Sequence, residues 1–332
     1  MGWARAGAAI GTSAGGLLTE GLGWRSIFLI NLPVGVLALL LVGKLLPADT
    51  PQGVRSVRRL DLPGAVLGTS GLLLLGYAVG AIAEPAMRTS ATIALVLALV
   101  LLAGFVVVET RSAAPLMPLR LFRIREVAGS AVVNALVGAA HVPAFALLAL
   151  YLQNTQHYGP TQSGLAVLPV AAAGLISSRT VIPAATKRFG THTLLWVGLA
   201  LQAIALAWFA TLPATVNYLS DVLPAALILG VGLPASFVGV TVPAVTAVDQ
   251  ADAGVTVGVV NTAQRIGSGL GVTAILVLAS TVTGTAGYLA GLQVGFAAAA
   301  AFALLGCLLT LALLRPKATA TPLPQPAEAA HR

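Results

Sequence analysis

The run ATIALVLALVLLAGFVVVE, residues 91–109, decides what kind of fold this chain adopts. Its only charged residue is Glu109, at the end of the run. A bilayer core of roughly 30 Å is crossed by a helix of about 20 apolar residues, so this run predicts a membrane-spanning helix. Nine further runs of similar character lie at 2–19, 26–46, 62–83, 128–152, 162–182, 193–212, 221–248, 253–283 and 287–314. The chain is therefore predicted to be an all-α integral membrane protein with about ten transmembrane helices.

The composition also indicates that lipid surrounds most of the chain. Hydrophobic residues make up 58% of the 332 residues and charged residues only 8%, against roughly 25% charged residues in soluble domains. The formal net charge is +8 at pH 7, but the bases occur in short clusters between apolar runs. This pattern is typical of membrane topology, and it argues against nucleic acid as a partner.

Basic residues alternate between the predicted connections. The second, fourth and sixth connections and the tail hold Lys44, Arg55, Arg58, Arg59, Arg111, Arg120, Arg123, Arg125, Arg179, Lys187, Arg188, Arg315, Lys317 and Arg332. The connections between them hold only Arg25 and Arg88, or no base. Because Lys and Arg collect on the cytoplasmic side of membrane proteins, we predict a multi-pass protein of the cell membrane with a cytoplasmic C-terminus.

Two segments outside the spans allow predictions of their own. The connection 110–127 combines leucines with four arginines. It fits a short amphipathic helix along the cytoplasmic interface and, equally well, a simple basic anchor for topology. The tail 315–332 is rich in proline and alanine, and it is predicted to be disordered.

Glycines recur every four residues in the first predicted span, at Gly7, Gly11 and Gly15, with Gly16 beside the last. This spacing leaves a groove on one face of a helix, where another helix can approach closely. Ordinary helix packing explains the spacing as well as a dedicated motif does.

The stretch that follows, GLLTEGLGWRSIFLINLPVG at residues 16–35, is far more specific. It resembles the end of the fifth span, the outer loop and the start of the sixth span in the major facilitator superfamily, above all in the fourteen-span drug:proton antiporters. The residues that carry the outer-loop resemblance are Trp24, Arg25, Asn31 and Pro33. The glycine run 7–16 is similar to that family's antiporter motif, with Thr12 where the family has a helix-loosening proline.

The resemblance continues along the chain, at 115–122, 151–169 and 261–271. It implies a partial major facilitator fold that begins at the family's fifth span, with four N-terminal spans missing. The implied divisions are the last two spans of an N-terminal bundle (1–46), a loop with two extra central spans and a basic connection (47–127), a C-terminal six-helix bundle (128–314) and the tail (315–332).

The candidates for a substrate cavity are mostly polar residues in or directly beside predicted spans, because ionisable groups are costly in lipid and usually mark function. The candidates are Asn134, His141, Phe145, Gln153, Asn261, Gln264 and Arg265. Arg265 lies roughly 16 Å into its span at 1.5 Å per residue. Its role is open between holding the fold and binding or gating, and His141 is open between a satisfied interior histidine and a titrating group.

No acidic residue falls near the middle of a predicted span. A proton-coupled exporter needs a group that gains and loses a proton along the transport path. The resemblance places such an acid in the family's first span, so the chain alone is not expected to couple to protons.

The resemblance implies a proton-coupled efflux transporter for hydrophobic or amphipathic drug- or antibiotic-like compounds, with a lining suited to greasy cations or neutral molecules. The expected partners are a small-molecule substrate, protons, the lipid bilayer and the missing spans. The alternatives are a carrier for another small metabolite and a fragment that is inactive alone. An enzyme is not expected, since the four histidines and Cys307 show no ligand spacing for a metal. No phosphate-binding loop or other cofactor motif occurs.

Overall fold

The computed structural model describes residues 21–45 except 22, 24 and 30, and residues 61–314 except 83, 113 and 114. Every regular element in these ranges is helical. The longer helices are α3 (Asn31–Leu45), α4 (Leu62–Ala81), α5 (Arg88–Arg111), α6 (Arg125–Leu150), α7 (Pro160–Arg179), α8 (Val181–Phe209), α9 (Leu223–Thr246), α10 (Gln250–Ala286) and α11 (Tyr288–Leu313). The short elements are α2 (Ser26–Leu29), η2 (Pro85–Met87), η3 (Leu119–Arg123), η4 (Tyr151–Thr155) and η5 (Tyr218–Val222).

Eight helices of the described chain, α4 to α11, are long and apolar enough to cross a membrane. They confirm the eight spans predicted between residues 62 and 314. The first predicted span, 2–19, lies outside the described residues. The second is represented by α3, whose apolar part Asn31–Leu41 is shorter than a full span and whose side chains in that part are all exposed. A total of ten spans stays a prediction.

The connection before α8 differs from the prediction. The sequence left residues 183–192 as a loop, but helix α8 already begins at Val181, and only Gly190 interrupts it, at φ 78° and ψ 167°. Only a residue without a side chain adopts this backbone conformation at little cost, so the glycine turns the chain between two helical pieces. The basic pair Lys187 and Arg188 therefore lies on a short helix.

The connection 110–127 contains one helical turn, η3. Its Leu121 is 1% exposed and lies in the core, whereas Arg120 and Arg123 are exposed. Arg120 donates two hydrogen bonds to the Asp252 carboxylate, at 2.9 and 2.7 Å, and so ties this turn to the start of α10. The turn has one buried apolar side and one exposed basic side, and whether it lies along the membrane interface stays a prediction.

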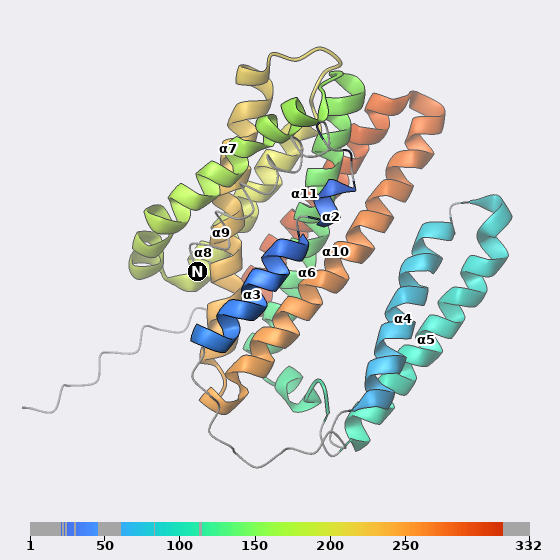
Figure 1. Cartoon of the computed structure of the whole chain (residues 1–332), viewed down its shortest axis with the longest axis vertical. Helices are drawn as coiled ribbons and strands as arrows, with labels where there is room; N and C mark the ends of the chain where they lie inside the picture. Colours follow the sequence, from blue (N-terminus) through green and yellow to red (C-terminus); the bar gives the residue numbers. More distant parts are fainter. Residues whose placement is uncertain are drawn as a thin grey trace, which may run out of the picture.

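Helices α6 to α11 pack into a bundle, and the hairpin of α4 and α5 stands beside α10 (Figure 1). The start of α4, the end of α5 and η3 lie at the same end of the molecule (Figure 1). Arg125 at the start of α6 donates to the carbonyls of Ala312 and Leu313, which joins that end of α6 to the end of α11. The bundle core is apolar, and its largest fully buried side chains include Tyr151, Phe209 and Phe296.

Candidate functional site

Helix α10 is fixed against α6 by close backbone contact. A Cβ atom on Gly267 would collide with the Ala135 carbonyl oxygen, and one on Gly271 would lie 2.5 Å from the Ala139 Cα. A Cβ on Gly138 of α6 would likewise meet the Gln264 carbonyl oxygen. Small residues let membrane helices approach this closely and gain dispersion energy along the whole contact. One face of α10 is therefore held rigidly by the bundle.

Asn134 belongs to this same interface. It is 0% exposed, and its Nδ2 donates a 2.8 Å hydrogen bond to the Val260 carbonyl of α10. Gln264, 8% exposed, also lies on this buried side of α10. Both were predicted for a substrate cavity, and the structure places both between the helices.

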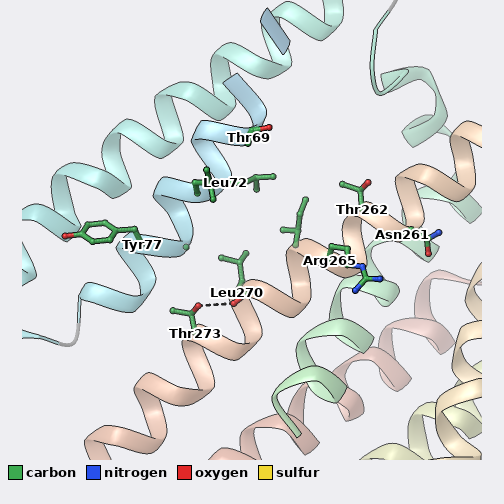
Figure 2. A pocket seen from close by; sticks show the side chains of 12 residues that line it. Thr69, Leu72, Tyr77, Asn261, Thr262, Arg265, Leu270 and Thr273 are labelled. Atoms are coloured by element: carbon green, nitrogen blue, oxygen red, sulfur yellow. Dashed lines mark hydrogen bonds between the residues drawn. The ribbon is translucent and has the colours of Figure 1, made fainter. Parts of the chain in front are cut away.

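The other side of α10 is open. Asn261, Thr262 and Arg265 are exposed there, and together with α4 they border a groove of about 590 Å³. In Figure 2 the polar ends of Asn261 and Arg265 point away from α4, whereas Leu270 reaches toward it. The lining residues are Thr69, Leu72, Leu73, Gly76, Tyr77, Asn261, Thr262, Arg265, Ile266, Gly269, Leu270 and Thr273.

Arg265 has no counter-ion in the described chain. The one ion pair found there joins Arg120 to Asp252, and no hydrogen bond involves the Arg265 side chain. Arg265 lies about 22 Å along α10 from Gln250 at 1.5 Å per residue, far from either end of the helix. An arginine at this depth must face water, a cavity or a partner.

His141 of α6 lies close enough to Arg265 for an electrostatic interaction. Its Nδ1 donates a 2.8 Å hydrogen bond to the Val137 carbonyl, since a carbonyl can only accept. The imidazole meets the ring of Phe237 edge-on, with centroids 5.6 Å apart and an interplanar angle of 82°. Three helices, α6, α9 and α10, thus bring His141, Phe237 and Arg265 into one region, with Nε2 of His141 unused by this contact.

The remaining predicted residues lie elsewhere. Phe145 is half-buried against the bundle core, and Gln153 is exposed in η4, at the far end of α6. Arg25, Asn31 and Pro33 are exposed around the start of α3. Trp24 and the four glycines Gly7, Gly11, Gly15 and Gly16 fall outside the described residues.

The sequence did not single out Phe237 or the α4 side of the groove. Thr69 and Tyr77 lie in an apolar span, and no pattern in α4 alone shows that it faces α10. The structure also shows a second buried polar link between helices: Gln202 of α8, 0% exposed, donates a 2.7 Å hydrogen bond to the Ser236 hydroxyl of α9.

Eight long apolar helices, and a groove bordered by an arginine that has no ion pair among the described residues, define a multi-pass membrane protein with room for a solute. The sequence profile of the Major Facilitator Superfamily matches residues 1–272. The chain belongs to this superfamily of membrane transporters.

Curated relatives carry export or resistance names. The cephamycin export protein of Amycolatopsis lactamdurans is 37% identical over 285 residues, which are 84% of this chain and 57% of that protein. The puromycin resistance protein of Streptomyces alboniger is 37% identical over 322 residues, 93% and 63% of the two chains. The tetracenomycin C resistance and export protein of Streptomyces glaucescens is 32% identical over 284 residues, 84% and 51%. The chain spans between about half and two-thirds of the length of these relatives.

Proposed function

We propose that this chain is the carboxyl-terminal part of a proton-coupled exporter of hydrophobic or amphipathic, antibiotic-like compounds. The observation that carries the proposal is the open face of α10, on which Arg265 and Asn261 are exposed at the border of a groove within the span. The names of the relatives support export as the direction of transport. In this proposal the protein lies in the cell membrane with its C-terminus in the cytoplasm.

The proposed division of the chain follows its helices. Residues 1–46 supply the last two spans of an N-terminal bundle, 47–127 the two extra central spans with their flanking loops, and 128–314 the C-terminal bundle, with a tail at 315–332. Packing of α6 to α11 on one another, with α4 and α5 beside them, supports this division. We propose a fourteen-span exporter with further spans ahead of residue 1, and the greater length of the relatives supports spans beyond those of this chain.

The placement of acidic side chains supports a coupling group outside the described residues. Asp61 caps the first turn of α4 by accepting a bond from the Gly64 N–H. Glu109 accepts from the Leu116 and Met117 N–H groups, and Asp252 pairs with Arg120. Each of these carboxylates serves a helix end or a loop. A proton carrier within the transport path is therefore proposed in the preceding spans.

Efflux measurements test the proposal. Cells that express the gene from its full upstream reading frame are loaded with a panel of fluorescent amphipathic dyes, and efflux is followed with and without a proton gradient. Gradient-dependent efflux is expected from the extended protein and not from residues 1–332 alone. Efflux that ignores the gradient contradicts proton coupling, and efflux driven by residues 1–332 alone contradicts the proposed position of the coupling group. Absence of efflux from the extended protein for every dye contradicts the export function.

A further inference from the structure

The described part of the groove carries positive charge without a balancing negative one. Arg265 is exposed on α10 and has no ion pair there. The described carboxylates nearest in sequence, Asp249 and Asp252, lie at the start of α10, and Asp252 is already paired with Arg120. A guanidinium stays charged at any physiological pH. A fixed cation therefore stands at the border of the groove, without a counter-ion in the described residues.

The side chains around Arg265 favour a particular kind of ligand. Asn261 lies one helical turn away on the same face and offers amide donors, and the Thr262 hydroxyl also borders the groove. The rest of the lining is mostly apolar, with Leu72, Leu73 and Ile266 among it. A planar guanidinium matches the two oxygens of a carboxylate in a bidentate pair.

We propose that this site selects amphipathic organic acids, with a carboxylate paired to Arg265 at the border of the groove and an apolar body that extends from there between α4 and α10. The proposal rests on the proposed export function and names its substrate class. It differs from the expectation of greasy cations, because a fixed cation repels a second one. Neutral analogues of the same shape bind more weakly, since they leave the arginine without its partner.

A matched set of probes tests the charge preference. The probes are dansylated undecanoic acid, its methyl ester and the amine of equal chain length. Their binding to the chain, held in nanodiscs of phosphatidylcholine, is measured by dansyl fluorescence. The acid is expected to bind at least tenfold more tightly than the ester, and the amine most weakly. Equal affinity of acid and ester in the unaltered chain overturns the proposal without any variant.

Substitutions test whether Arg265 causes the preference for the acid over the ester. Arg265→Gln is expected to bring the affinity for the acid down to that for the ester, and Arg265→Lys to keep part of the difference. Arg88→Gln, an exposed arginine at the start of α5, is the matched control and leaves the preference unchanged. Each variant is first checked for a monodisperse gel-filtration peak. An acid preference that survives in folded Arg265→Gln overturns the assignment to Arg265.

Two further measurements are needed. The first distinguishes a transported acid from a bound lipid, and the second tests the binding site separately from the export function. Replacing a third of the phosphatidylcholine by phosphatidylglycerol tests whether a lipid headgroup is the anion, and complete displacement of the acid probe overturns the substrate assignment. Efflux of the acid and the ester is also compared in cells that express the extended protein. Export of both at equal rates overturns the inference and leaves the export function standing. Acid-selective binding without export of either probe leaves the site standing and contradicts the proposed function.

Discussion

Glycines and polar residues occur on both sides of α10, but their roles on the two sides are opposite. Toward α6, Gly267 and Gly271 remove the side chains that would hold the backbones apart. Toward α4, Gly269 has no atom within 4 Å of its Cβ position and leaves open space in the groove. The polar residues divide in the same way: Asn134 of α6 is fully buried and its Nδ2 donates to α10, whereas Asn261 and Arg265 are exposed.

This contrast shows how a membrane helix combines a rigid support with a solute-facing surface. The contact with α6 fixes the position and rotation of α10. The open face then holds its polar side chains at a defined place without further support. Binding groups carried by a rigid element keep their geometry better than groups on loops.

The largest expected effect on stability comes from placing a side chain in the close contact between α10 and α6. Gly267→Leu forces α10 away from the Ala135 carbonyl, and overpacking that the backbone must relieve costs about 3 kcal/mol or more. Gly269→Leu is the matched control two residues away, where the side chain enters open space. We expect Gly267→Leu to remove most of the monodisperse protein from gel filtration and Gly269→Leu to retain it. Equal yields contradict the close contact.

A smaller effect on stability is expected from removing the buried amide of Asn134. Asn134→Ala removes the bond to the Val260 carbonyl, and interhelical hydrogen bonds in membranes contribute about 0.6–1.7 kcal/mol. Asn261→Ala, on the open face, is expected to change stability by less than about 0.5 kcal/mol. Unfolding is followed through the buried Cys307, the single cysteine of the chain, with a thiol-reactive dye on heating. An equal loss for both variants means that the two asparagines do not differ in environment.

The smallest effect on stability is expected on the α4 side. Gly76 borders the groove and has no atom within 4 Å of its Cβ position, so Gly76→Leu is expected to change the free energy of unfolding by less than about 0.5 kcal/mol. The new side chain occupies the groove, so the affinity for the dansylated acid should fall. Gly71→Leu is the contrasting variant, since its Cβ would lie 2.9 Å from Leu102 of α5 and strain the hairpin. A stable Gly76→Leu protein with unchanged affinity shows that the ligand binds elsewhere.

The spans were predictable because the hydrocarbon thickness sets a length that an apolar run must reach. The depth of Arg265 followed from its position in such a run. The environment of Asn134 could not be predicted, because periodicity places a residue on a face of its helix but does not say which neighbour covers that face. Phe237 and Tyr77 gave no signal for a similar reason: aromatic residues in an apolar span are usual, and only the packing of α9 on α6 and of α4 beside α10 brings them to the site.

Local conformation was the other limit of sequence reasoning. A basic, glycine-containing segment after α7 predicted a loop, yet helix continues through Lys187 and Arg188 to the turn at Gly190. Lysine and arginine are good helix formers, so a pair of these residues marks the end of a membrane span more reliably than the end of a helix.

Thiol labelling tests the open face of α10 most directly. In a Cys307→Ala background, Thr262→Cys and Val260→Cys place single thiols two residues apart, the first on the exposed face and the second where Val260 is 1% exposed. A hydrophilic maleimide reacts with a thiolate that water reaches. An open face predicts rapid labelling of Thr262→Cys in nanodiscs, and labelling of Val260→Cys only after unfolding. Equal labelling of both, or protection of Thr262→Cys, would contradict an open, water-accessible face on α10.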